Sequence, residues 1–171
     1  TTLFRSYICL GIAAVLVALD QLVKFWAEHS LSQVDTIALI PGVFHLTYVQ
    51  NFGAAFNTMN NQRLLLVVLT SAVLLVIFVL LLLGKLRSPW MVVSWSLILA
   101  GGAGNLIDRL FREGGYVVDL FDFRLINFPV FNVADICVTV GMALFLVYFI
   151  FIERKEHRRF EIRQEIKRHE Q

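Results

Sequence analysis

The sequence has few charged residues and only two cysteines for a chain of 171 residues. Charged residues make up 16% of it and hydrophobic residues 58%, with a mean hydropathy of +0.72. Soluble domains carry roughly a quarter charged residues, so this composition excludes an ordinary soluble domain. It indicates a polytopic membrane protein, and the length leaves room for one helical bundle without a separate soluble domain.

The cysteines and histidines form no pattern typical of a metal site or of nucleophilic catalysis. Cys9 and Cys137 each lie inside an apolar run without a partner at metal-ligand spacing, so we interpret them as buried free thiols. The four histidines all lie outside the apolar runs: His29, His45, His157 and His169. No Ser/His/Asp or Cys/His arrangement is present, and we expect no metal, no cofactor and no nucleic-acid partner.

Four apolar runs are long enough to cross the hydrocarbon core of a membrane. The expected spans are about 5–27, 64–83, 90–111 and 133–152. The first run continues past Asp20 without a small-residue cleavage site, so it is expected to be a permanent span. The sequence therefore predicts an all-α membrane protein in which residues 1–171 form a single polytopic domain.

The distribution of lysine and arginine predicts the orientation of the spans. Residues 27–62 contain neither residue type, whereas the turn at 84–89 is basic and the tail at 153–171 carries seven basic residues. With four spans, both basic segments and Arg5 lie on one side, which is then the cytoplasm. We expect cytoplasmic N- and C-termini and extracytoplasmic segments at 28–61 and 112–131.

The first extracytoplasmic segment has the pattern of a small sheet. Residues 37–40 and 43–50 are rich in β-branched and aromatic residues, and Pro41 and Gly42 between them favour a turn. We expect a β-sheet cradle with an apolar face on the membrane surface, and a short surface helix or loop in the second connector. Residues 51–57 follow, where Gly53 allows close backbone approach, as a turn or as a substrate cradle.

The remaining unusual polar residues all fall near the extracytoplasmic ends of the spans. Ionisable groups in lipid are costly, so by default they indicate function. Each also has a structural explanation: a snorkelling pair, a packing network, or a helix N-cap. Packing alone does not predict that all of them gather at one membrane face. They are Asp20, Lys24, Asn105, Asp108, Arg109, Asp119, Asn132 and Asp135.

Two carboxylates brought close in a low-dielectric site share one proton. The ionised member then takes a proton from water while the protonated member polarises a scissile carbonyl. Asp135 and an aspartate of the second connector fit this chemistry, but the spacing alone does not choose between Asp119 and Asp122. A four-span channel, carrier or assembly factor is the alternative, although the spans at 64–83 and 133–152 carry few polar residues along their depth.

Five blocks, in order along the chain, resemble the lipoprotein signal peptidase (signal peptidase II) family. They lie at residues 20–24, 51–56, 101–109, 117–119 and 131–135. A membrane aspartyl protease of the Gly-x-Gly-Asp type fits less well, because this chain has Asn105 where that motif has its aspartate. The resemblance implies an aspartyl endopeptidase of the bacterial cytoplasmic membrane, with its site at the outer, periplasmic face. It would remove the signal peptide of prolipoproteins by cutting before a diacylglyceryl-modified cysteine.

The resemblance also implies roles for individual residues. Asp119 and Asp135 match the catalytic pair, which leaves Asp122 an accessory role at most. Other matching positions would bind substrate or shape the site: Asp20, Lys24, Asn51, Asn105, Arg109 and Asn132. Gly53 and Asp108, which lie in the same blocks, are further candidates for this role. The implied partners are prolipoproteins, membrane lipid and peptide antibiotics such as globomycin as inhibitors, and we expect a monomer.

Overall fold

The computed structural model describes residues 2–34, 36–53 and 62–152. It contains the long helices α1 (Thr2–Ser30), α2 (Arg63–Leu82), α3 (Pro89–Phe111) and α4 (Val133–Val147), the last continuing as a π-helical segment, Tyr148–Ile152. The strands are β1 (Ile37–Ile40), β2 (Phe44–Asn51) and β3 (Val117–Phe123). Part of the predicted cradle, residues 54–57, and the predicted cytoplasmic tail lie outside the described residues.

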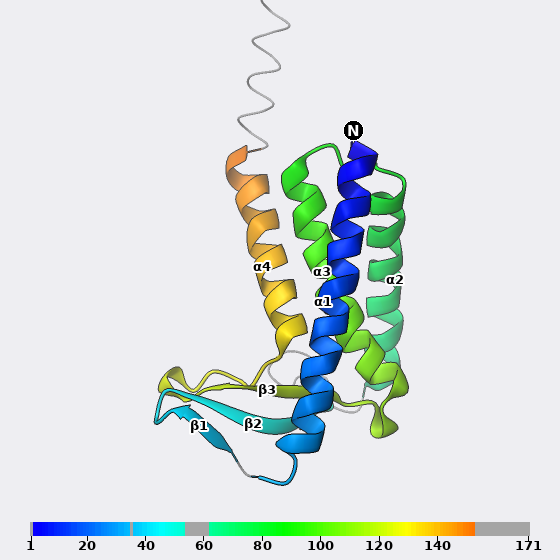
Figure 1. Ribbon diagram of the computed structural model, residues 1–171. Helices are drawn as coiled ribbons and strands as arrows, with labels where there is room; N and C mark the ends of the chain where they lie inside the picture. Colours follow the sequence, from blue (N-terminus) through cyan, green and yellow to red (C-terminus); the bar gives the residue numbers. More distant parts are fainter. Residues whose placement is uncertain (1, 35, 54–61, 153–171) are drawn as a thin grey trace, which may run out of the picture.

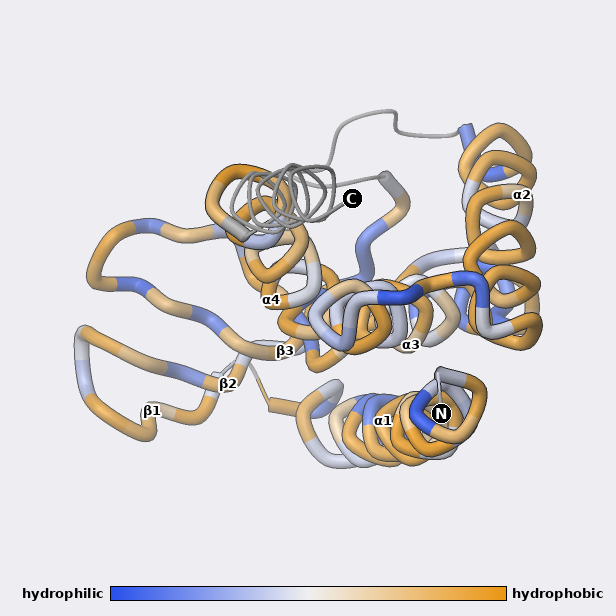
Figure 2. The backbone as a smooth tube through the Cα atoms, turned by 90° about the horizontal axis from the view of Figure 1, so that it is seen from above, coloured by the Kyte–Doolittle hydropathy of each residue, from blue (hydrophilic) through white to orange (hydrophobic). Residues whose placement is uncertain are grey.

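The helices form a bundle with the sheet at one end and the N-terminus at the other (Figure 1). In the described part of the chain, four helices are long and apolar enough to cross a membrane, which confirms the predicted four-span class. Seen from above, α3 lies centrally, with α1, α2 and α4 around it, and apolar residues dominate the helices (Figure 2). All three neighbours pack on α3.

Small residues on α3 allow α1 and α4 to approach it closely. A Cβ atom on Gly101 would collide with the Ala134 carbonyl oxygen of α4. On Gly104 it would lie 2.5 Å from Asp20 Oδ2 of α1. Farther along the same interface, Ser94 Oγ donates a hydrogen bond of 2.7 Å to the Gly141 carbonyl. Since α3 and α4 both carry predicted site residues, these contacts set the spacing of the site.

Replacing Gly101 by alanine should therefore push α3 and α4 apart. We expect Gly101→Ala to lower the free energy of unfolding by about 1–3 kcal/mol, as overpacking does. Gly11→Ala is the matched control, because a Cβ on this helical glycine meets nothing within 4 Å. The control should be neutral, or stabilising by up to about 1 kcal/mol. Thermal unfolding of both variants in detergent checks this, and equal effects would contradict the close-packing argument.

The sheet is antiparallel with strand order β1-β2-β3. The hairpin of β1 and β2 confirms the predicted strand, turn and return strand, and Gly42 adopts a φ of +74° in its turn. The strand β3 was not predicted. It has the β-branched and aromatic residues of a strand, but its partner β2 lies far away in the sequence. Short 3₁₀ segments, Glu113–Gly115 and Arg124–Ile126, flank it.

A buried cluster fixes the sheet to the bundle. Val118 and Leu120 of β3 pack against Ala27 and Leu31 at the end of α1. The exposed fraction of all four side chains is 1% or less. Anchored in this way, the middle of β3 lies against the bundle, whereas β1 extends away from it (Figure 1).

Candidate active site between the sheet and the helices

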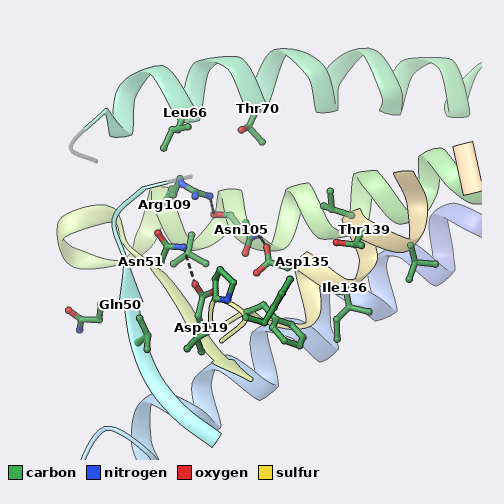
Figure 3. A pocket seen from close by; sticks show the side chains of 18 residues that line it. Gln50, Asn51, Leu66, Thr70, Asn105, Arg109, Asp119, Asp135, Ile136 and Thr139 are labelled. Atoms are coloured by element: carbon green, nitrogen blue, oxygen red, sulfur yellow. Dashed lines mark hydrogen bonds between the residues drawn. The ribbon is translucent and has the colours of Figure 1, made fainter. Parts of the chain in front are cut away.

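A cavity of about 1000 Å³ lies where the sheet meets α2, α3 and α4. Its polar side chains come from every one of these elements, with Asn51 on β2 and Asp119 on β3 facing Asn105, Arg109 and Asp135 of the helices (Figure 3). The rest of its lining is largely apolar. The structure therefore brings five of the predicted site residues, from four segments of the chain, into one cavity.

Asp119 lies in the middle of β3 with only 2% of its surface exposed. One carboxylate oxygen accepts a hydrogen bond from Asn51 Nδ2 at 3.0 Å, and the other accepts one from Asn132 Nδ2 at 2.6 Å. Burial raises the pKa of Asp119 to about 7, and the negative charge of Asp135 adds to this shift. At neutral pH this carboxyl group is thus able to hold a proton.

Asp135 lies in the first turn of α4 and combines two roles. Asn132 Oδ1 accepts from the Asp135 backbone N–H at 2.9 Å, and Asp135 Oδ2 accepts from the Asn132 backbone N–H at 3.1 Å. This capping box is the structural explanation that the sequence offered for both residues. Asp135 Oδ1 also accepts from Asn105 Nδ2 at 2.8 Å, and the side chain lines the cavity. The cap therefore presents the carboxylate at the site.

The side chains of Asn132 and Asn105 connect the two carboxylates. Asn132 Nδ2, which donates to Asp119, lies 3.1 Å from Asn105 Oδ1. Asn105 Nδ2 in turn donates to Asp135. This chain of amides holds one oxygen of each aspartate in a fixed direction. A polar network whose members are hydrogen-bonded is rigid, so these amides limit the movement of both carboxylate groups.

Asp20, Lys24 and Asp108 form an ionic cluster behind the cavity and do not line it. Lys24 Nζ lies 2.9 Å from carboxylate oxygens of both aspartates and donates to Asn105 Oδ1 at 2.9 Å. The exposed side-chain fraction of all three charged residues is 1% or less, so the idea of a snorkelling Lys24 is wrong, although its pairing with Asp20 is confirmed. Lys24 supports the site through Asn105.

The two aspartates of this cluster hold the elements that carry the catalytic candidates. Asp20 Oδ1 accepts from the Ala134 N–H at 2.8 Å, and Asp108 Oδ2 accepts from the Val118 N–H at 3.2 Å. These N–H groups belong to residues directly before Asp135 and Asp119. Asp108 therefore contacts Lys24 of α1 and does not line the cavity, whereas Asn105 and Arg109 do.

Arg109 reaches across the cavity to the end of β2. Its Nη2 donates to the Gly53 carbonyl at 2.8 Å and its Nη1 to the Asn105 carbonyl at 3.3 Å. Gly53 also donates its N–H to Asn51 Oδ1 at 3.0 Å, so the same turn orients an Asp119 partner. Of the predicted cradle at residues 51–57, the structure thus places Asn51 and Gly53 at the site.

Asp122 lies outside the cavity. It accepts hydrogen bonds from Thr47 Oγ1 at 2.8 Å and from Arg124 Nε at 2.7 Å. Burial alone would raise the pKa of Asp122, but these two partners hold it below its ordinary value. The sequence spacing did not decide whether Asp119 or Asp122 lies near Asp135. In the structure Asp119 lies in the cavity, and Asp122 forms a salt bridge elsewhere on the sheet.

Some cavity residues were not singled out from the sequence. Thr70 on α2 lines the cavity together with Leu66 and Thr139 (Figure 3). A single threonine in an apolar span has no pattern that predicts this position. Within residues 2–34, 36–53 and 62–152, no group of three His, Cys, Asp or Glu side chains is arranged to hold a metal ion.

Comparison with known proteins gives a consistent picture. The family model described as signal peptidase (SPase) II matches residues 12–151. The lipoprotein signal peptidase of Streptococcus thermophilus (strain CNRZ 1066) is 43% identical over 142 residues, covering 83% of this chain and 92% of that protein. That of Brevibacillus brevis is 40% identical over 148 residues, covering 86% and 97%. A solved structure described as a bacterial membrane enzyme is 28% identical, with a TM-score of 0.77, covering 84% and 87% of the two chains.

Proposed function

The chain belongs to the signal peptidase II family, and from this membership and the cavity we propose that it is an aspartic endopeptidase. It removes the signal peptide of prolipoproteins by cutting before a cysteine that carries a diacylglyceryl group. One observation carries the proposal above all: Asp119 and Asp135 line the same cavity and are joined through Asn132 and Asn105.

In the proposed reaction the two carboxyl groups share one proton. The ionised member removes a proton from a water molecule, which attacks the scissile carbonyl carbon. The protonated member donates to the carbonyl oxygen, and a tetrahedral intermediate forms without a covalent bond to the enzyme. A proton then passes to the leaving nitrogen as the C–N bond breaks. Arg109 adds positive charge at the cavity wall and orients the turn at Gly53.

The cavity also suits a lipid-modified substrate. Three large apolar residues that line it are exposed at its edge: Phe128 (46%), Ile136 (43%) and Val140 (44%). Ile136 and Val140 lie on α4, and exposed apolar residues on a membrane-spanning helix face lipid, so the cavity opens sideways to the hydrocarbon beside α4. Acyl chains attached to the cysteine can stay in that apolar region while the peptide bond reaches the carboxylates.

The charge distribution supports a site at the outer face of the bacterial cytoplasmic membrane. Arg5 lies near the start of α1, and Lys85 and Arg87 lie in the turn between α2 and α3. Both positions are at the end of the bundle opposite the sheet (Figure 1). Together with the seven basic residues at 153–171, these residues outnumber Arg63, Arg112 and Arg124 near the sheet. Because basic residues concentrate on the cytoplasmic side, we propose that the sheet and the cavity lie on the outer side, where a translocated lipoprotein precursor is anchored.

The rate of cleavage should fall as the pH rises above neutrality. With the Asp119 pKa at about 7, the shared proton is present at lower pH and is lost above that value. We expect kcat/KM to decrease toward about tenfold per pH unit on the alkaline side. The pH profile of kcat/KM measures this, and Asp122→Asn, which lies outside the cavity, should leave the profile unchanged. A rate that stays constant or rises from about pH 7 to about pH 9 would contradict the assignment.

The substrate proposal is tested with purified protein and one prolipoprotein prepared with and without the diacylglyceryl group. We expect cleavage of the modified form and a value of kcat/KM at least about a hundredfold lower for the unmodified form, because the acyl chains supply binding energy. Equal values for both forms would refute the lipid-dependent part of the proposal. No cleavage of either form would refute the peptidase proposal itself.

A further inference from the structure

The face of α2 that packs on α3 is interrupted by the cavity. Leu74, Ile77 and Leu81 are buried against α3. Arg63, Leu66 and Thr70 precede them on α2 at the same spacing of three or four residues, so all six residues lie on one face of the helix. Thr70 and Leu66 line the cavity instead of packing on α3, and Arg63 contacts α3 again. Arg63 thus closes this face of α2 at the end nearest the sheet.

Arg63 holds the last turn of α3 through its backbone. Its Nε donates to the Arg109 carbonyl at 2.8 Å and its Nη2 to the Leu110 carbonyl at 3.3 Å. Carbonyl groups in the last turn of a helix have no partner within the helix, and a cation there also interacts favourably with the helix dipole. One side chain of α2 therefore caps α3 at the residue whose guanidinium group lines the cavity.

A glycine provides the space that this side chain occupies. Gly115 adopts a φ of +74°, and a Cβ atom on it would collide with the Arg63 side chain, Nε included. The neighbouring Gly114 has a similar φ of +82°, but its Cβ would meet Phe52 only at an ordinary contact distance of 3.5 Å. The end of α3 and the turn that follows it thus contact the exposed Arg63 side chain on two sides.

We propose that Arg63 is a positioning residue for the reaction. It holds α2 against α3, so that the α2 side chains that line the cavity can bind the lipidated substrate. The inference rests on the proposed function. Asp119 and Asp135 are held by Asn51, Asn105 and Asn132, and the Arg63 hydrogen bonds go to other residues. Loss of the Arg63 contacts therefore acts on the apolar wall around Leu66 and on substrate binding, and leaves the carboxylates in place.

The kinetic test compares Arg63→Gln with the unaltered protein on a lipidated prolipoprotein. We expect KM to rise about fivefold or more while kcat stays within about twofold. Arg63→Lys keeps a cation and can bond one carbonyl, so it should recover part of the loss in KM. An unchanged KM for Arg63→Gln, or a fall in kcat as large as the fall in kcat/KM, would overturn the inference.

The two glycines supply a matched pair of variants that leave Arg63 itself in the chain. Gly115→Ala should raise KM as Arg63→Gln does, and combining the two changes should add little, because both remove the same contact. Gly114→Ala introduces the same backbone strain without meeting Arg63, so its KM should stay near that of the unaltered protein. Equal KM values for the two alanine variants would count against the role of Arg63.

A distance measurement separates this inference from the proposed function. Spin labels at Leu64 on α2 and Met142 on α4, both exposed, report the spacing of the helices on either side of the cavity once Cys9 and Cys137 are replaced by alanine. Arg63→Gln should broaden the distance distribution, and an unchanged distribution overturns the inference. If the unaltered protein cuts no lipidated substrate, the proposed function fails first. If it cuts and Arg63→Gln changes neither KM nor the distance, only the role of Arg63 fails.

Discussion

Asp119→Asn and Asp135→Asn, made separately, should each reduce kcat for prolipoprotein cleavage by about 10³-fold or more. Each substitution removes a carboxyl group that the pair needs either to activate water or to protonate the carbonyl oxygen. Asparagine has nearly the same shape and keeps one of the two acceptor oxygens, so one hydrogen bond is lost at each position while the side chain keeps its place, and substrate binding should survive. Initial rates with a lipidated substrate, together with a binding measurement, test both expectations.

Asp122→Asn is the matched control for the catalytic pair. Asp122 lies on the same strand as Asp119 but bonds to Thr47 and Arg124 outside the cavity. This variant should keep kcat within about twofold of the unaltered protein. If Asp119→Asn or Asp135→Asn retained near-normal rates while folded, that aspartate would be structural. If Asp122→Asn lost activity while folded, the assignment of the pair would have to change.

Lys24→Met should lower the free energy of unfolding by about 3–5 kcal/mol, enough to prevent folding of a marginally stable protein. The Lys24 ammonium group is fully buried and lies 2.9 Å from carboxylate oxygens of both Asp20 and Asp108. Methionine fills a similar volume but leaves the buried Asp20 without a cation and Asp108 with Arg112 alone, whose Nε lies 3.1 Å from Asp108 Oδ1. The loss also removes the hydrogen bond to Asn105, so any folded fraction should cleave more slowly.

Lys85→Met is the control for this second prediction, because Lys85 is exposed in the turn after α2. Its loss should change the unfolding free energy by no more than about 0.5 kcal/mol. Unfolding of both variants in the same detergent, followed by intrinsic fluorescence, gives the comparison. A Lys24→Met protein as stable as the control would show that the buried aspartates are not held by this cation.

The parts of the fold that depend on local pattern were predictable from the sequence. Four apolar runs, each long enough to cross a membrane, define the bundle, and Pro41 and Gly42 between two β-rich segments define the hairpin of β1 and β2. The strand β3 was not predicted, because its pairing joins Asp119 to Val49 of β2 across a long stretch of sequence. No local periodicity records a partner at that separation.

The sequence indicated which residues belong to the site, but it did not indicate which of their side chains line the cavity and which contact other helices. Asn105, Asp108 and Arg109 are close together on α3, but α3 is surrounded by three helices, so neighbouring positions meet different partners. Asp108 contacts Lys24 of α1, whereas Arg109 lines the cavity. The choice between Asp119 and Asp122 came from the family resemblance, and their opposite environments in the sheet now give it a structural basis.

Arg63 shows which information a sequence cannot supply. A basic residue at the start of an apolar run is a common way to end a membrane span, and nothing in its position predicts a partner. Its meaning depends on the two α3 carbonyls and on Gly115, all more than 40 residues further along the chain. Contacts of this kind appear only when the helices are placed side by side.

Identifying the bond that the protein cuts would test the account most directly. Purified protein is incubated with a diacylglyceryl-modified prolipoprotein, and both products are analysed by mass spectrometry, with Asp119→Asn and Asp135→Asn as blanks. The account predicts one cut, directly before the modified cysteine, which leaves that cysteine with a free amino group, and no products from either blank. Cleavage at another bond, or the same products from a folded blank, would contradict it.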